Sequence, residues 1–309
     1  KEKVANLRCT HGMYLDGVAT PIEVWDFSFG FVMPGSRNTW QTTVEAAGGE
    51  RMLKTAALIQ PHNPDFVSIT YGAGGGTRST TMRYAKMLKD EHGFEVMPHL
   101  TCVGHTKDEL LEILEDFANA GFCNIMALRG DPLKGESEFR PDPDGFSYAS
   151  DLVSLIRENF PHFGIGVGGY PEKHPEASDL KTDLKNLKTK VDAGADFITT
   201  QLFFDNQVYL DFVRNCKETG ISVPVLPGLL PVLSIGQVRR FCAMCEARLP
   251  NQLEQALEAE TKEHQPKIGA RWALEQVKGL LDAGAPGFHL YALNQSTSTL
   301  AILEGVGRA

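Results

Sequence analysis

One pattern recurs along the chain: an amphipathic stretch ends near a glycine, and a short apolar run follows. The pattern is clearest in MLKDEHGFEVMPHLTC, DFANAGFCNIMALRG, KVDAGADFITTQLFF, CKETGISVPVLPGLL and LLDAGAPGFHLYALN. A glycine just past a helix takes up the left-handed cap, and a short apolar run suits a strand buried on both faces. The repetition therefore predicts an α/β protein built on a parallel sheet.

Three further apolar runs, VWDFSFGFV, DFVSITYG and FGIGVGGYP, bring the predicted strands to eight. Eight βα units of short period favour a (β/α)8 TIM barrel over a doubly wound sheet. No Pro/Gly/Ser-rich linker divides the chain. We therefore predict an N-terminal extension over residues 1–20 and a single domain over residues 21–309. The charged segment at about 249–265, poor in large apolar residues, is expected to be an excursion before the last helix.

Composition and charge argue against nucleic acids and membranes as partners. The chain has 309 residues, 42% of them hydrophobic, and a formal net charge of -9, which predicts a full core and no nucleic-acid partner. No apolar run approaches the roughly 20 residues of a membrane span, and KEKVANLRCTHG lacks the apolar core of a signal peptide. We expect no membrane association and a cytoplasmic location.

Two groups of potential metal ligands are interpreted as structural. Cys242 and Cys245, in a helical segment, have no second pair to complete a zinc site, so the six scattered cysteines are read as reduced thiols. His99, Cys102 and His105 have suggestive spacing. A strand cannot easily bring all three to one ion, and no carboxylate joins them, so we predict no metal.

Polar residues gather where the predicted strands end. The ends read TYGAGGG, PHLTC, LRGDP, GGYPEKHPEA, TQLFFD, PGLLP and YALNQ. In this architecture the carboxyl ends of the strands carry the chemistry, so we predict a concave polar site there. The run NIMALRGDP, which ends in Arg129-Gly130-Asp131, is the sharpest example: a strand suited to the core finishes with a cation and an anion. A turn with a local ion pair is the alternative interpretation.

Two motifs leave alternatives open. GAGGGT, Gly72 to Thr77, precedes a helix and suits either a phosphate cradle or a flexible turn, but it does not fit G-x-G-x-x-G. In DLKTDLKNLKTKVDAG a polar stripe of Asp183, Asn186 and Lys190 is either a solvated face or a contact for the ribose and diphosphate of a long ligand. The buried stripe beside it is Leu180, Leu184, Leu187 and Val191.

The rim motifs, in this order, resemble those of the methylenetetrahydrofolate reductase family, flavin-dependent enzymes of one-carbon metabolism. The resemblance runs from about Pro64 to Asn294. It is dense in FVSITYGA, PHLTC, NIMALRGDP, YASDLV, GYPEKHPEA, DLKNLKTKVDAGADFITTQLFFD and HLYALN. It implies a TIM barrel that holds FAD, takes a hydride from NADH or NADPH, and reduces 5,10-methylenetetrahydrofolate to the 5-methyl product that serves methionine biosynthesis.

The resemblance also implies individual roles. The implied cofactor-binding residues are Thr70, Tyr71, Ala73, His99, Arg129, Gly130, Asp131, Tyr148, Ala149, Tyr170, His174, Ala177, Asp183, Asn186 and Lys190. Asp131 and Gln201 are the implied catalytic residues: the carboxylate would stabilise the positive charge of the opened folate and tune the flavin. Gln201 would contact nicotinamide and pterin in turn, and Tyr291 would border the folate. One pocket used in two states implies ping-pong kinetics.

The sequence departs from the family at two positions on the folate side. The family carries an acid on the first strand, within a Phe-Glu-Phe-Phe-Pro-Pro motif, and SFGFVMP places Gly30 there. Asp26 is a weak substitute, because four residues along a strand span roughly 13 Å. Gln295, a candidate substrate-binding residue, stands where the family usually has arginine. We therefore expect flavin and nicotinamide binding to be retained and pterin handling to be altered.

Three hypotheses follow from this asymmetry. In the first, the chain is a working reductase or an enzyme that oxidises 5-methyltetrahydrofolate in the reverse direction. In the second, it is a flavin enzyme that acts on another one-carbon carrier or imine. In the third, it is a non-catalytic flavoprotein or partner subunit. NADH is favoured over NADPH because the chain lacks the C-terminal regulatory domain of eukaryotic members. A homo-oligomer is expected.

Overall fold

The computed structural model describes residues 22–26, 41–70, 78–131, 139–292 and 296–306. The predicted extension over residues 1–20, the predicted first strand beyond Asp26, and the GAGGGT motif lie outside the described residues. Four candidate site residues, Gly30, Tyr71, Ala73 and Gln295, lie outside them too.

The strands form one parallel sheet. They are β1 Ile22–Asp26, β2 Phe66–Ile69, β3 Val96–Thr101, β4 Asn124–Leu128, β5 Gly164–Gly169, β6 Phe197–Thr200, β7 Val225–Leu226, β8 Gly228–Leu229 and β9 Phe288–Tyr291. The strand order is β7-β6-β5-β4-β3-β2-β1-β9-β8. Only Pro227 separates β7, which pairs with β6, from β8, which pairs with β9. The predicted α/β fold with a parallel sheet is confirmed.

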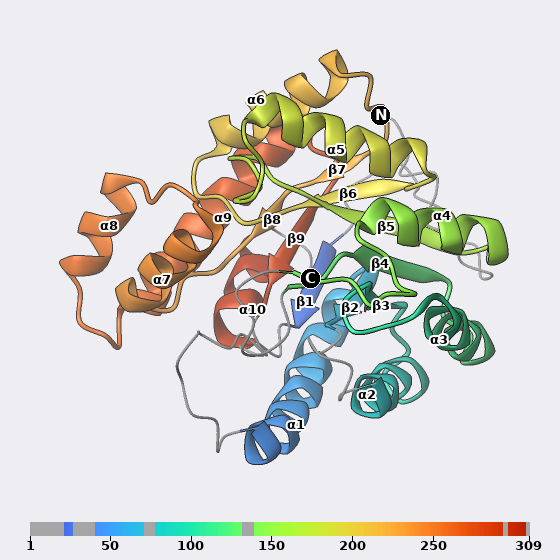
Figure 1. Ribbon diagram of the computed structural model, residues 1–309. Coiled ribbons are helices and arrows are strands. Elements are labelled where there is room, and N and C mark those ends of the chain that lie inside the picture. The colour runs from blue at the N-terminus through green and yellow to red at the C-terminus, as the bar shows by residue number, and fades with distance from the viewer. Residues whose placement is uncertain (1–21, 27–40, 71–77, 132–138, 293–295, 307–309) are drawn as a thin grey trace.

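Helices pack along the outside of the curled sheet (Figure 1). The helices are α1 Gln41–Ile59, η1 Gln60–His62, α2 Arg78–Asp90, α3 Lys107–Asn119, α4 Ala149–Asn159, α5 Leu180–Asp192, α6 Asn206–Glu218, α7 Ile235–Cys245, α8 Asn251–Glu258, α9 Gln265–Asp282 and α10 Ser296–Gly305. Within the described parts of the chain, no helix combines the length and the apolar character needed to cross a membrane.

The core has two layers, as the alternation of side chains along a strand requires. In β6, Ile198 packs with the outer cluster between sheet and helices, and Phe197 packs with the inner cluster. The rings of Phe197 and Phe66 meet edge-on inside the sheet, with centroids 6.1 Å apart. Because β2 and β6 are not neighbouring strands, this contact requires the sheet to curl until the two face each other.

The glycines that predicted the helix ends have the expected conformation. Each follows a helix with a positive φ, between 72° and 118°: Gly93, Gly121, Gly194, Gly220 and Gly284. A residue with a Cβ is strained there, so these positions end helices and turn the chain towards the next strand.

The predicted buried stripe of α5 is also confirmed: Leu184 and Leu187 are buried, and Leu180 and Val191 pack against the same cluster. The segment at 249–265 differs from expectation, because it contains a helix, α8. Leu253 and Leu257, four residues apart, are fully buried on one face. Two leucines in a charged segment suffice to pack one face of a two-turn helix against the core.

Candidate active site

The rim candidates of β4, β5 and α5 come together at one edge of the sheet. Asp131 lies within the electrostatic influence of Arg129, His174 and Glu176. Tyr170 lies within that of Asp131 and Asp183. The loop after β4, the loop after β5 and helix α5 therefore share one polar surface, as the position of the strand ends predicts.

Arg129 forms an ion pair, but its partner is Glu176 and not Asp131. The guanidinium donates from two nitrogens to the two carboxylate oxygens of Glu176, at 2.5 and 2.7 Å. It also lies over the ring of Phe139, 4.7 Å from the centroid. Such a bidentate pair fixes both position and orientation of the fork. It ties the loop after β4 to the loop after β5.

The sharp turn at Gly130 separates the two charges of the Arg-Gly-Asp motif. Gly130 has φ of 91°, and a Cβ there would meet Val103 Cγ1 at 2.4 Å. The Asp131 side chain is exposed to solvent, but protein atoms crowd around its carboxyl group. This partial desolvation raises the pKa of Asp131, and the nearby charges of Arg129 and His174 oppose the rise. A carboxyl whose pKa is raised in this way is a candidate for chemistry.

The loop after β5 is folded by its own contacts. The backbone N–H of His174 donates to Asp183 Oδ2 at 3.0 Å, and its ring nitrogen Nδ1 accepts from the Glu176 N–H at 3.1 Å. The Tyr170 and His174 rings meet edge-on at 4.5 Å. Asp183 thus holds the loop against α5. The neighbouring Ala177 donates its N–H to the His174 carbonyl.

The polar stripe of α5 is only partly a solvated face. Asn186 is exposed, whereas Asp183 is buried. Lys190 Nζ donates to the Gly168 carbonyl at 2.6 Å, and burial lowers the pKa of Lys190 to about 8, an effect that Asp183 opposes. Burial likewise raises the pKa of Asp183. A half-buried ammonium at a sheet edge is suited to a phosphate.

Gln201 and Tyr291 lie where β6 and β9 end. Gln201 donates its N–H to the Gly169 carbonyl at 2.7 Å, and its side-chain Oε1 accepts from the Leu202 N–H at 2.9 Å. The Tyr291 hydroxyl donates to the Thr200 carbonyl at 2.6 Å. Both side chains are thereby oriented from backbone groups of β6 and its loop.

The remaining candidates lie in varied surroundings. His99 is buried on β3, and burial lowers its pKa to about 3, which keeps the imidazole neutral. The Thr70 carbonyl accepts from the Thr81 hydroxyl at 3.3 Å. Tyr148 is 65% exposed and precedes Ala149, the first residue of α4. Asp26 ends β1, in register with Ile69.

The possible metal ligands make other contacts. Cys102 Sγ donates to the Leu128 and Tyr148 carbonyls at 3.4 and 3.5 Å. Among the described residues, no group of three or more His, Cys, Asp or Glu side chains could hold a metal ion.

Three features escaped sequence reasoning. The first is Glu176 as the partner of Arg129, although HPEA is part of the recognised motif. The second is Arg248, which contacts the loops after β5 and β6 from a segment of no obvious function. The third is a pair of buried threonines on the inner face: within the described structure, Thr101 Oγ1 and Thr199 Oγ1 have no hydrogen-bond partner.

These features allow a test of whether the site suits a flavin nucleotide. Gly168, in register with Thr199, is not crowded: a Cβ there would make one ordinary van der Waals contact, with Leu128 Cδ2 at 3.7 Å. Buried hydroxyls without partners need a ligand or water to satisfy them. Two inner-face hydroxyls, an uncrowded glycine and the half-buried Lys190 fit a ring with polar edges joined to a diphosphate.

A curled parallel sheet with polar residues gathered at the carboxyl ends of its strands is typical of α/β enzymes that bind small molecules there. The model of the methylenetetrahydrofolate reductase family matches residues 27–307, so the chain belongs to this family. The predicted membership of this family is confirmed.

Named relatives agree with the family. The chain is 43% identical over 248 residues to the 5,10-methylenetetrahydrofolate reductase of Escherichia coli K12, covering 79% of this chain and 81% of that protein. It is 37% identical over 293 residues to methylenetetrahydrofolate reductase (NADH) 1 of Arabidopsis thaliana, covering 91% of this chain and 48% of that protein.

A solved structure supports the fold. A Clostridium thermocellum protein, described as binding two copies of 5-methyl-5,6,7,8-tetrahydrofolic acid, superposes with a TM-score of 0.61 over 93% of each chain, at 16% sequence identity. At this identity the likeness supports the architecture alone.

Proposed function

We propose that this chain is an FAD-dependent methylenetetrahydrofolate reductase. It transfers a hydride from NADH through FAD to 5,10-methylenetetrahydrofolate, giving 5-methyltetrahydrofolate, or catalyses the reverse oxidation in a methyl-disposing pathway. The observation that carries the proposal is the electrostatically coupled group at the rim: Arg129, Asp131, Tyr170, His174, Asp183 and Lys190. The names of the relatives supply the reaction.

We propose that residues 21–309 form one FAD-binding (β/α)8 barrel, with residues 1–20 as an extension. β7 and β8 then act as one strand, interrupted at Pro227, that joins β6 to β9 and closes the sheet. The pairings of β7 with β6 and of β8 with β9 support this closure, as does the contact between Phe66 and Phe197 across the interior.

FAD supplies the hydride relay between the two substrates. Lys190 and Arg129 would face its diphosphate, and Asp183 would face a ribose. Thr101 and Thr199 would meet polar edges of the ring system. The other cofactor-binding candidates remain as the family motif implies: Thr70, Tyr71, Ala73, His99, Gly130, Asp131, Tyr148, Ala149, Tyr170, His174, Ala177 and Asn186.

Asp131 would act through its charge. Hydride acceptance by the folate begins with an iminium cation, and a fixed carboxylate lowers the energy of that cation. The raised pKa of Asp131 means that it loses this charge at a higher pH than an ordinary aspartate does. Gln201 would contact nicotinamide and pterin in turn, and Tyr291 and Gln295 would border the folate.

A related flavin enzyme with a different one-carbon acceptor is the second candidate. The observation that favours it is Gly30, which stands where the family has its acid. Asp26 remains a weak substitute, because it stands four residues before Gly30, roughly 13 Å along a strand. If the missing acid at Gly30 abolished turnover altogether, the chain would be a non-catalytic flavoprotein.

We also propose a nicotinamide preference, a location and an oligomeric state. NADH is preferred to NADPH, in line with the name of the Arabidopsis relative. We expect a cytoplasmic homo-oligomer; free thiols at the five described cysteines suit a reducing compartment. Light scattering of the purified chain tests the oligomer.

The deciding experiment is anaerobic. The flavin absorbance of the FAD-loaded chain is followed while NADH and then 5,10-methylenetetrahydrofolate are added. Bleaching by NADH and recovery with folate is the expected result. Bleaching without recovery would favour a different acceptor, and failure to bind FAD would refute the proposal.

A further inference from the structure

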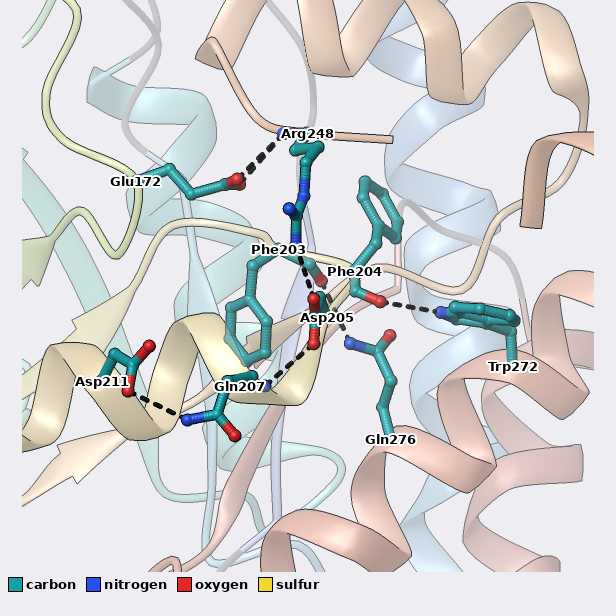
Figure 2. A network of polar contacts seen from close by, with 9 residues as sticks. All are labelled: Glu172, Phe203, Phe204, Asp205, Gln207, Asp211, Arg248, Trp272 and Gln276. Carbon is teal, nitrogen blue, oxygen red and sulfur yellow. Dashed lines mark hydrogen bonds and ion pairs between the residues drawn. The ribbon is translucent and has the colours of Figure 1, made fainter. Parts of the chain in front are cut away.

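The segment after α7, residues 246–249, contacts two loops of the rim at once. Lys173 Nζ lies 3.6 Å from Glu246 Oε2, and the Arg248 N–H donates to both carboxylate oxygens of Glu172 at 3.1 Å. The guanidinium of Arg248 donates in the other direction, to Asp205 Oδ2 at 2.5 Å. Figure 2 shows Arg248 between Glu172 and Asp205.

The two loops are those of the proposed active site. Glu172 and Lys173 belong to the loop after β5, two residues from Tyr170 and next to His174. Asp205 ends the loop after β6, which begins with Gln201. The backbone of Arg248 therefore holds one loop, and its side chain holds the other.

The loop after β6 has two other attachments: its first residue, Gln201, is bound through its N–H to the Gly169 carbonyl of β5, and its middle is fixed from behind by α9. Trp272 Nε1 donates to the Phe204 carbonyl at 3.1 Å, and Gln276 Nε2 donates to the Phe203 carbonyl at 3.3 Å (Figure 2). These bonds anchor the middle of the loop. Its far end is Asp205, whose Oδ1 accepts from the Gln207 N–H at 3.0 Å and so caps α6. The second carboxylate oxygen remains for Arg248.

We propose that Arg248 is a positioning residue for Gln201: it fixes the loop after β6 relative to the loop after β5. The inference rests on the proposed function, in which Gln201 meets both substrates and the loop after β5 meets the flavin. A shift between the loops changes the distance from Gln201 to the flavin plane. Small errors of this kind cost rate rather than stability, because hydride transfer requires close alignment.

The ion pair between Arg248 and Asp205 is expected to add little to the free energy of unfolding. Arg248 and Asp205 are 63% and 39% exposed, and exposed pairs contribute little to folding. A comparable exposed cation lies nearby on α7. Arg239 is 51% exposed and forms ion pairs with Glu254 and Glu258 of α8, not with either loop. Arg239→Gln is therefore the control for loss of an exposed ion pair.

The variant Arg248→Gln separates the two contacts. It keeps the backbone N–H that Glu172 accepts and removes the cation that Asp205 holds. In the FAD-loaded chain, hydrogen exchange of residues 201–205 should quicken while that of residues 170–177 stays unchanged. The flavin dissociation constant should stay within about twofold of the wild type. Both hydride half-reactions, by stopped flow, should slow by about tenfold.

Two further variants test whether Arg248 acts through Gln201. Arg248→Lys keeps a cation and should recover part of the lost rate. Arg248→Gln placed on Gln201→Ala should add little further loss, since residues that act through one another are not additive.

Three outcomes would overturn the proposal: unchanged exchange at 201–205, a rate loss no larger than that of Arg239→Gln, or full additivity with Gln201→Ala. If the chain binds no flavin, the proposed function fails by itself, and hydrogen exchange of the flavin-free chain still decides whether Arg248 holds the loop.

Discussion

The Tyr291 hydroxyl reaches across β8 to donate a hydrogen bond to the Thr200 carbonyl, 2.6 Å away. It passes over Gly228, whose N–H donates to the Thr200 hydroxyl at 2.9 Å. β9 and β6 are thereby tied together over a strand that has no side chain at the crossing point. The same Tyr291 is the candidate border of the folate, so this contact between β9 and β6 also orients one side chain of the proposed site.

Gly228→Ala should lower the free energy of unfolding by about 2 kcal/mol or more, because a Cβ would lie 2.2 Å from the Thr200 oxygen and 2.8 Å from the Tyr291 ring. Urea unfolding measures the change. Gly168→Ala is the matched control, since its Cβ would meet only Leu128 Cδ2, at 3.7 Å. Equal stability of the two variants would contradict the crossing contact.

Lys190 should make stability depend on alkaline pH. Its pKa is lowered from 10.5 to about 8 in the fold, so between these values the folded chain releases the proton that the unfolded chain keeps. The unfolded state then binds more protons, and the free energy of unfolding rises with pH. Burial of the charge causes the shift, and the full rise is about 3 kcal/mol at most.

Lys190→Met should lack this rise. The measurement is urea unfolding of the flavin-free chain from neutral pH to about pH 10, as the difference between wild type and variant, which removes the titration of other groups. Lys188→Met is the control, because Lys188 pairs with Asp192 on the exposed face of the same helix. A difference that does not grow with pH would show that Lys190 is not desolvated.

Thr199→Val should stabilise the flavin-free chain and weaken flavin binding. The buried hydroxyl has no partner within the described structure, so its removal abolishes a desolvation cost of about 1 kcal/mol or more. If the hydroxyl meets a polar edge of the flavin, affinity falls about fivefold or more. Thermal unfolding and a fluorescence titration measure the two effects. Thr189→Val, on the exposed face of α5, is the control; unchanged flavin affinity would remove Thr199 from the site.

The periodic glycines and apolar runs were sufficient to predict the parallel α/β fold. The glycines after the helices, Gly93, Gly121, Gly194, Gly220 and Gly284, have positive φ, which a residue without a Cβ adopts at no steric cost. Local signals of this kind need no knowledge of the rest of the chain. Helix α8 was missed because its burial depends on two leucines alone, whose neighbours are charged.

The location of the candidate site at the strand ends could be predicted from the sequence, but the contacts among its residues could not. Strand ends identify the rim, since parallel strands end at the same edge. The partner of Arg129 is 47 residues away in sequence, at Glu176, while an anion stands two residues away at Asp131. Only the turn at Gly130, with its positive φ, separates the near pair. Arg248 could not be singled out from the sequence, because its contacts depend on which loops the fold brings beside it.

Asp131→Asn should distinguish the two half-reactions. Loss of the carboxylate removes the charge that would stabilise the folate iminium, so folate reduction should slow by roughly 10²- to 10³-fold, whereas reduction of the flavin by NADH should change much less. Anaerobic stopped-flow absorbance measures each step. Asp142→Asn, in the same loop, is the control: its Oδ1 accepts from the Asp144 N–H, a bond that an asparagine oxygen also accepts.

The pH dependence gives an independent check on Asp131. Because desolvation raises its pKa, the wild-type folate half-reaction should lose rate at a higher pH than an ordinary aspartate would cause, as protonation removes the charge. This acid limb should be absent from Asp131→Asn and present in Asp142→Asn. Equal slowing of both half-reactions, or an acid limb that survives in Asp131→Asn, would assign the charge effect to another group and leave Asp131 with a binding role.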